Sequence, residues 1–227
     1  MSTTSNAAHT PGRLVVVAGT GTEVGKTWVA AGLASHLRAG GATVVARKPA
    51  QSFESADVAA ACTDADLLAA ATGDAAVQVC PEHRWYEVPM APPMAASALG
   101  RDPVLVADLV AETTEWWSTR SDSSALGLVE LAGGPWSPAA SDGDGIDLTR
   151  ALAPAAVVLV AHAGLGTLNA VRPALGALSP IAPVHVLLNR FDEGIDLHRR
   201  NLDWLREHER IRPACSMAEL AEQLTAP

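Results

Sequence analysis

Five short runs of apolar residues recur along the chain and predict five buried strands. Leu14-Val15-Val16-Val17-Ala18 shows their character, because its apolar, β-branched residues follow one another without alternating polar positions. Such runs are typical of strands covered on both faces, as in a parallel sheet flanked by helices. The predicted strands span residues 14–18, 43–46, 126–129, 156–160 and 184–188.

Between these runs, apolar residues return at helical spacing. Residues 28–38 form the first such segment, which ends before Gly40-Gly41 and gives the order strand, helix, strand of a βαβ unit. Further helices are expected at 64–72, 103–118, 167–178 and 197–208. The alternation predicts an α/β fold with a mostly parallel β-sheet flanked by helices.

Two long segments fit neither pattern. Residues 81–93 are crowded with proline, and residues 133–145 are rich in Gly, Ser and Asp. Long connections within a compact domain are often functional, so both segments are expected to serve a site.

Composition narrows the class of protein. With 227 residues, 48% hydrophobic and 18% charged, the chain suits one folded domain, expected at 13–227 after a flexible tail at 1–12. The net charge of -9 argues against a nucleic-acid partner, and no apolar run is long enough to span a membrane. Three widely spaced cysteines predict neither a disulfide framework nor a metal pair, which favours a reducing, cytoplasmic setting.

The segment between the first strand and the first helix carries the strongest signal for chemistry. It reads Gly19-Thr20-Gly21-Thr22-Glu23-Val24-Gly25-Lys26-Thr27, and Gly-Lys-Thr at a helix start is the working end of a P-loop. Backbone N–H groups there would cradle phosphate, Lys26 would face the β- and γ-phosphates, and the Thr27 hydroxyl would bind Mg²⁺. The first glycine lies one position earlier than in the common pattern. This predicts a P-loop NTPase-like single domain that binds the phosphates of a nucleotide.

Other polar residues follow the remaining strands and would meet at the same edge of the sheet. Lys48 follows the second strand, where it can face a phosphate or simply be solvated, and Glu130 ends the third strand, where it can anchor Mg²⁺ or cap the next element. Asp64 is explained by helix capping alone, whereas Asp66 could also complete a metal shell. Asn189 follows the last strand, where a nucleobase site and a plain turn fit equally well.

Taken in order, these segments resemble the dethiobiotin synthetases, a family of ATP-dependent cyclo-ligases. The resemblance runs from Val15 to Asn189 and is most specific in the longer P-loop, with Lys48-Pro49-Ala50-Gln51-Ser52, Val129-Glu130 and Leu165-Gly166-Thr167-Leu168-Asn169 in the family's order. It implies that 7,8-diaminopelargonic acid takes up CO₂ as a carbamate. Attack on the γ-phosphate of ATP and ring closure by the second amine would then give dethiobiotin.

The resemblance also implies roles for individual residues. Lys26 and Lys48 would be catalytic, and Mg²⁺ would be held by Thr27, Asp66 and Glu130. A homodimer is implied, because a partner subunit would supply Asn169 to the substrate carboxylate. Residues implied to bind ATP are Gly21, Thr22, Glu23, Val24, Gly25, Lys26, Thr27 and Asn189, and those implied to contact substrate are Thr22, Ser52, Leu131 and Asn169.

Three departures from the family pattern leave alternatives open. Leu131 and Phe53 replace glycines of the family pattern, so either their bulk narrows the amine pocket or the loops shift and the side chains point away, and the segment after Asn189 lacks the family's base-side loop. A divergent paralogue acting on another amine is therefore one alternative. An ATP switch of the ParA and MinD type is the other, although Gly21 stands where such proteins carry a signature lysine.

Overall fold

A parallel five-stranded sheet forms the centre of the protein. The computed structural model describes residues 12–54, 63–120 and 125–226, so the expected tail lies almost wholly outside the described residues, as does Cys62. The sheet order is β2-β5-β1-β8-β9, and each neighbouring pair is parallel. The strands are β1 (Arg13–Gly19), β2 (Val44–Arg47), β5 (Leu126–Glu130), β8 (Ala156–His162) and β9 (Val184–Asn189).

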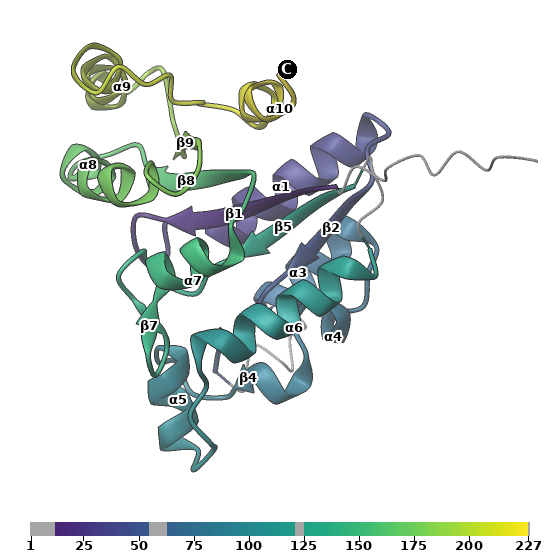
Figure 1. Ribbon diagram of the computed structural model, residues 1–227. Helices are drawn as coiled ribbons and strands as arrows, with labels where there is room; N and C mark the ends of the chain where they lie inside the picture. The colour runs from purple at the N-terminus through teal and green to yellow at the C-terminus, as the bar shows by residue number, and fades with distance from the viewer. Residues whose placement is uncertain (1–11, 55–62, 121–124, 227) are drawn as a thin grey trace, which may run out of the picture.

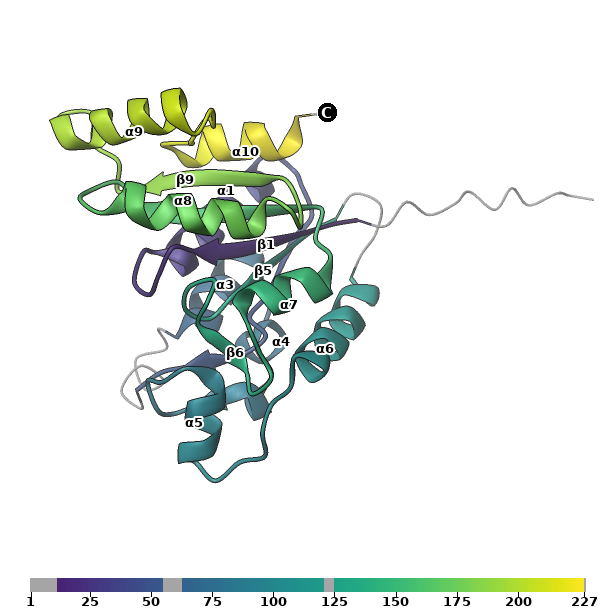
Figure 2. The same ribbon diagram turned by 60° about the vertical axis from the view of Figure 1, so that its left-hand side comes forward.

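Helices cover both faces of this sheet, which places the apolar strands between two hydrophobic cores (Figures 1 and 2). Successive residues of β1 point to opposite faces, so Val15 and Val17 enter one core whereas Val16 and Ala18 enter the other. The first core is covered by α1 (Lys26–Ala39), α3 (Asp64–Thr72), α4 (Ala76–Val79) and α10 (Met217–Thr225). The second is covered by α6 (Val106–Ser118), α7 (Gly145–Leu152), α8 (Thr167–Leu178) and α9 (Asp196–His208).

Every strand and helix predicted from the apolar pattern is present, and the α/β fold class is confirmed. The largest difference among the predicted elements is at α6, which begins at Val106 instead of 103. The pattern missed α7 and α10, and it also missed α5 (Pro92–Ala98), which begins with Pro92-Pro93. Proline is compatible with the first turn of a helix, where its missing N–H has no intrahelical partner, so these prolines begin a helix.

The two segments left unassigned by the pattern contain small elements near the carboxyl edge of the sheet. Residues 81–93 include η1 (Glu82–Arg84) and β4 (Trp85–Tyr86), which pairs in parallel with β3 (Gln51–Ser52). Residues 133–145 include the antiparallel pair of β6 (Pro138–Ala140) and β7 (Gly143–Asp144). In both views α5 lies at the bottom of the molecule, with β7 labelled above it in Figure 1 and β6 labelled above it in Figure 2.

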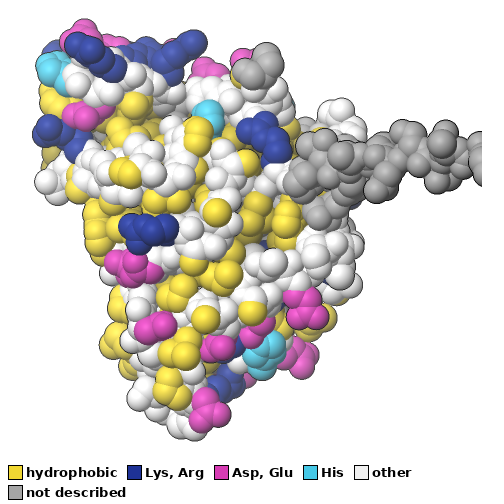
Figure 3. All heavy atoms as spheres, in the orientation of Figure 1, with side chains coloured by type: hydrophobic (Ala, Val, Ile, Leu, Met, Phe, Trp, Pro, Cys, Tyr) yellow, Lys and Arg dark blue, Asp and Glu magenta, His cyan; other side chains and the backbone are white. Residues whose placement is uncertain are grey.

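The surface is mixed in character. On the face shown in Figure 3, charged side chains of both signs gather over α9, whereas apolar side chains elsewhere are scattered among uncharged and acidic ones. The α9 charges include Arg199 and Arg200, which both pair with Asp196, while Leu205 of the same helix enters the core. None of the described helices combines the length and apolar character needed to cross a bilayer.

Gly127, in the middle of β5, permits the close packing of α6 on the sheet. A Cβ at this position would lie 2.6 Å from the Trp117 ring and 3.0 Å from Leu14 Cδ1. We expect Gly127→Ala to lower the free energy of unfolding by about 1–3 kcal/mol, because the overpacked core must shift. Urea denaturation measures the change.

Gly176 of α8 provides the matched control, since a Cβ there would meet no atom within 4 Å. Gly176→Ala should leave stability unchanged or raise it by up to about 1 kcal/mol. If Gly127→Ala unfolds at the same urea concentration as wild type, the inference that Trp117 packs closely on β5 is wrong.

Candidate active site

The P-loop occupies the turn from Gly19, the last residue of β1, to Lys26, the first residue of α1. Gly25 caps α1 in the left-handed conformation, with φ of 91°, and a Cβ at this position would collide with Asn189 Nδ2. The same Nδ2 donates a hydrogen bond to Val24 O at 2.9 Å. Asn189, the last residue of β9, therefore holds the loop in place from two strands away in the sheet.

Lys26 folds back over its own loop. Its side chain is mostly buried, with 7% of the residue exposed, and Nζ donates to Gly21 O at 3.1 Å. Burial lowers the pKa of Lys26, and the nearby charge of Lys48 lowers it further, against the opposing effect of Glu130 and Asp64. Lys26 thus adds a second cation close to Lys48.

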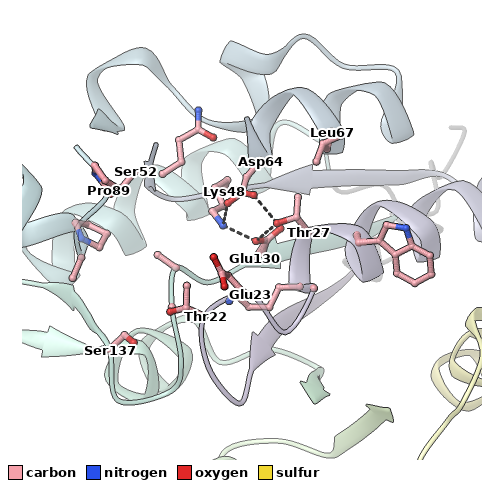
Figure 4. A pocket seen from close by; sticks show the side chains of 18 of the residues that line it. Thr22, Glu23, Thr27, Lys48, Ser52, Asp64, Leu67, Pro89, Glu130 and Ser137 are labelled. Carbon is pink, nitrogen blue, oxygen red and sulfur yellow. Dashed lines mark hydrogen bonds and ion pairs between the residues drawn. The ribbon is translucent and has the colours of Figure 1, made fainter. Parts of the chain in front are cut away.

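Lys48 lies at the centre of a buried ion-pair cluster (Figure 4). Its Nζ is 2.5 Å from Glu130 Oε1 and 2.6 Å from Asp64 Oδ2, while Thr27 Oγ1 lies 2.9 Å from Glu130 Oε1 and 2.7 Å from Asp64 Oδ1. Lys48 and Glu130 are 2% and 1% exposed. These two positions, Lys26 and Lys48, are the only lysines in the sequence.

The topology of the sheet explains why these residues meet. β5 lies between β1 and β2, with Glu130 level with Val17 and with Val129 level with Arg47. Because the strands are parallel, Glu130 comes to lie between the P-loop, which follows β1, and Lys48, which follows β2.

Electrostatics keep Lys48 and Asp64 charged, whereas burial raises the pKa of Glu130 despite the nearby charge of Lys48. Burial disfavours the charged form of Lys48, but the carboxylates of Glu130 and Asp64 outweigh it and raise the pKa of Lys48 above its ordinary value. Burial likewise disfavours the Asp64 carboxylate, yet Lys48 and the Thr27 hydroxyl lower the pKa of Asp64. At neutral pH the structure therefore holds a lysine ammonium against ionised Asp64.

Asp64 takes the place in this cluster that the sequence pattern gave to Asp66. Asp66 Oδ2 accepts a hydrogen bond from the Thr63 backbone N–H at 3.0 Å, and Thr63 Oγ1 accepts one from the Asp66 backbone N–H at 3.3 Å, which is a capping box at the start of α3. The interpretation of Asp66 as the acid at the site is corrected accordingly. Asp64 and Asp66 are two positions apart in a helix and point in different directions, so the acidic pair could not act together.

A cavity of about 720 Å³ opens beside the cluster. In Figure 4, Ser52, Pro89 and Ser137 lie on one side of it, and Thr27 and Leu67 lie on the other. P-loop residues and Lys48 therefore face a space that is much larger than a phosphate group. The cavity is lined by Thr22, Glu23, Gly25, Lys26, Thr27, Trp28, Lys48, Gln51, Ser52, Asp64, Leu67, Pro89, Met90, Ala91, Pro92, Glu130, Ala132, Gly133, Ser137 and Arg190.

Leu131 and Phe53, the two bulky residues at glycine positions of the family pattern, do not line the cavity. Leu131 is 1% exposed and belongs to the hydrophobic core on the α6 and α7 side of the sheet. Phe53 is 6% exposed and packs edge-on against Trp85, with ring centroids 6.0 Å apart. Of the two alternatives, the structure fits the one in which the side chains of Leu131 and Phe53 point away from the cavity.

Other expected site residues lie outside the cavity wall of this single chain. Asn169 is exposed in the first turn of α8, and Asn189 is buried beneath the P-loop. Gly21 and Val24 contribute backbone oxygens that accept from Lys26 and Asn189. The structure thus places Asn189, Gly21 and Val24 as parts of the loop's internal bonding, and Asn169 on the surface.

Several lining residues had no signal that set them apart in the sequence. Gln51 and Ser137 are ordinary polar residues, and Arg190 lies in a turn with φ of 57°, which sequence composition does not reveal. Ser137 Oγ accepts from Gly134 N at 2.8 Å, which holds the turn after β5. The presence of Ser137 in the wall confirms only that the unassigned segment 133–145 reaches the site.

Comparison with known proteins identifies the family. An AAA domain family model matches residues 13–225. ATP-dependent dethiobiotin synthetase from Caulobacter vibrioides (strain NA1000 / CB15N) is 41% identical over 71% of this chain and 72% of the relative. The same enzyme from Streptomyces coelicolor is 41% identical over 69% of this chain and 61% of the relative, and that from Caulobacter sp. (strain K31) is 40% identical over 79% and 76%.

The chain belongs to the dethiobiotin synthetase family. The resemblance noted in the sequence is confirmed, and with it the assignment to ATP-dependent ligases. Solved structures at lower identity support the fold alone. Chloroplast FtsY from Physcomitrella patens is 14% identical with a TM-score of 0.54, covering 99% of this chain and 68% of that one. A putative plasmid partition protein from Borrelia burgdorferi B31, bound to AMPPNP, is 12% identical with a TM-score of 0.52, covering 90% and 86%.

The oxygen donors of this dethiobiotin synthetase site fit a magnesium ion. Thr27 has one hydroxyl hydrogen but two carboxylate oxygens within hydrogen-bond distance, and Glu130 Oε2 is buried without a hydrogen-bond partner among the described residues. Two acids and a hydroxyl, all hard oxygen ligands, are the set that suits Mg²⁺ when phosphates and water complete its shell. The residues that could hold the ion are Thr27, Asp64 and Glu130.

Substitutions at Asp64, which contacts Lys48, and at Asp66, which caps α3, can be compared directly. We expect Asp64→Asn to raise the Mg²⁺ concentration needed for half-maximal phosphate release by about tenfold or more, because a charged hard-oxygen ligand is lost. Asp66→Ala should instead lower the free energy of unfolding by about 1 kcal/mol through loss of the cap. A Mg²⁺ titration and a urea melt of both variants measure these effects.

The opposite pattern would contradict the placement of these two acids. If Asp66→Ala shifts the Mg²⁺ requirement and Asp64→Asn does not, then Asp66, as the sequence pattern suggested, is the acid at the metal.

Proposed function

We propose that this chain is an ATP-dependent dethiobiotin synthetase that carboxylates 7,8-diaminopelargonic acid with CO₂ and closes the ureido ring. The observation that carries the proposal is Lys48, which lies buried against Glu130 and Asp64 beside the P-loop in a chain about 40% identical to curated dethiobiotin synthetases. Residues 13–227 would form one catalytic domain, supported by the family match over 13–225.

The cavity offers separate regions for the nucleotide and the amine. The P-loop lines one part of it, whereas Ser52, Pro89 and Ser137 line the side away from Thr27 (Figure 4). We place the triphosphate on the P-loop and the diamine toward Ser52 and Thr22. Leu131 and Phe53 do not line the cavity wall, so their bulk gives no reason to prefer a different amine substrate.

The reaction consumes one ATP and forms two bonds to the carbon of CO₂. One amine adds to CO₂ to give a carbamate, and its oxygen attacks the γ-phosphate, releasing ADP and leaving a carbamic-phosphoric anhydride. The second amine then attacks the carbonyl carbon and displaces phosphate, which closes the ring. Negative charge spreads over phosphate oxygens in such a transfer, so positioned cations contribute more than a side-chain nucleophile.

The two lysines are suited to that task. Lys48 Nζ has three hydrogens, of which two are directed to Glu130 and Asp64, so one remains to donate to a ligand oxygen. Lys26 would leave Gly21 O to bind the β- and γ-phosphates. Mg²⁺ held by Thr27, Asp64 and Glu130 would neutralise charge on the phosphates when bound.

The proposal extends to the assembly and the setting of the protein. We expect a homodimer, in which the exposed Asn169 of α8 is presented to the cavity of the partner. Exposed Leu165 lies in the turn just before this helix, with 91% of its surface accessible in the single chain, as a contact between subunits would require. A cytoplasmic location stays the expectation from cysteine usage.

The alternatives are less well supported. A ParA-like switch shares the fold, but Gly21 occupies the position of that class's signature lysine, and its backbone oxygen is engaged by Lys26. The fold likeness to a plasmid partition protein, at 12% identity, carries no functional weight.

Lys26→Ala tests the phosphate site. We expect phosphate release from ATP, diaminopelargonate and bicarbonate to fall by at least about a hundredfold, because the cation facing the phosphates is lost. Lys26 belongs to neither of the large hydrophobic cores, so the melting temperature should stay near that of wild type. Wild-type protein that releases no phosphate with these substrates would refute the proposed reaction.

Co-expression of Lys26→Ala with Asn169→Ala tests the shared site. If each cavity takes Asn169 from its partner, a mixed dimer has one intact cavity, and random pairing should restore about a quarter of wild-type activity. No recovery in the mixture, with both variants inactive alone, would show that Asn169 acts within its own chain.

A further inference from the structure

The carboxamide of Gln51 is buried in the cavity wall and has one end without a partner. Gln51 lies on β3, is 1% exposed and lines the cavity. Its Oε1 accepts a hydrogen bond from the Ala65 backbone N–H at 3.0 Å, whereas its Nε2 is buried and donates to no atom that the structure describes. Buried polar groups are rarely left unpaired, so this donor points to a partner supplied by a ligand.

The contact with Ala65 fixes which end of the carboxamide is free. Ala65 lies in the first turn of α3, where backbone N–H groups have no intrahelical acceptor. Only the oxygen end of Gln51 can satisfy that N–H, so the NH₂ group must be the end that faces away from the helix. An NH₂ group donates and does not accept, which restricts its partner to an acceptor.

The surroundings favour an anion as this partner. Ser52, the next residue of β3, also lines the cavity, and its Oγ is buried without a hydrogen-bond partner among the described residues. Lys26 and Lys48 line the same cavity. An unpaired donor near two cations suits a group with several acceptor oxygens, such as a carbamate or a phosphate.

We propose that Gln51 is a further binding residue of this site, whose Nε2 donates to an oxygen of the anion held in the cavity. That anion is the substrate carbamate or the γ-phosphate. Oε1 meanwhile ties β3 to the start of α3, which carries Asp64, so one side chain contacts the anion and holds the helix that presents the acid. The inference rests on the proposed function and adds a residue to its binding site.

A structure of the wild-type protein with a non-hydrolysable ATP analogue, Mg²⁺, diaminopelargonate and bicarbonate tests the contact. We expect Nε2 within about 3.2 Å of a carbamate or γ-phosphate oxygen. Nε2 bonded only to protein or water, with the nucleotide bound, would overturn the inference.

Gln51→Met tests the contribution of the contact in solution, because methionine keeps the length of the side chain but can neither donate nor accept as an amide does. Gln78→Met is the matched control. Gln78 is exposed, lies outside the cavity wall, and its Oε1 accepts from the Ala75 backbone N–H at 3.1 Å near the start of α4. Each variant thus loses one carboxamide bond to a helix start, but only Gln51→Met loses a donor beside the ligand.

We expect Gln51→Met to lower kcat/KM for the diamine at least tenfold, and Gln78→Met to match wild type. In Gln51→Met, a raised KM for the diamine with unchanged affinity for the ATP analogue would identify the carbamate as the anion. Weaker binding of the ATP analogue would identify the γ-phosphate. Equal kinetics in Gln51→Met and Gln78→Met would overturn the inference. If wild type fails to turn over, the proposed reaction fails, while analogue binding and the complex structure still test Gln51.

Discussion

The burial of the Lys48 ammonium against Glu130 and Asp64 is the interaction on which the site depends. A cation 2% exposed must be matched by nearby negative charge, because an unpaired buried charge costs several kcal/mol. Glu130 ends β5, Asp64 begins α3, and Thr27 in α1 contacts both acids. A single ion-pair cluster therefore fixes the ends of two strands and the starts of two helices in one arrangement.

The same cluster connects structure to chemistry. Glu130 and Asp64, which pair with Lys48, also present oxygen atoms suited to a divalent cation. One hydrogen of the Lys48 ammonium remains available to a ligand. The fold brings them together because the strands are parallel and β5 runs between β1 and β2. Asn189 supports the arrangement from β9 by holding the P-loop at Val24.

Sequence patterns predicted the scaffold well and the details of the site less well. Continuous apolar runs identified all five strands of the sheet, since a strand buried on both faces leaves little choice of residue. The P-loop, Lys48 and Glu130 were found because strand ends in a parallel sheet share one edge. The sequence pattern favoured Asp66 over Asp64 because both stand in the first turn of a helix, and only the direction of each side chain separates the acid that contacts Lys48 from the acid that caps the helix. Leu131 was misjudged for the same reason, since a strand end does not reveal which face its side chain joins. Gln51 lies in a segment that resembles the family, but no pattern gave it a role, because that role depends on a bond to a helix that begins thirteen residues later in the sequence.

Titration of the two lysine side chains tests the central claim most directly. Protein grown with ¹⁵N-lysine carries only two labelled ammonium groups, at Lys26 and Lys48, and Lys26→Arg assigns them. The structure predicts that Lys26 loses its proton below the ordinary lysine pKa of about 10.4, while Lys48 stays protonated above it. Glu130→Gln should lower the pKa of Lys48. A Lys48 signal that titrates at or below the ordinary value, or that does not respond to Glu130→Gln, would contradict the account.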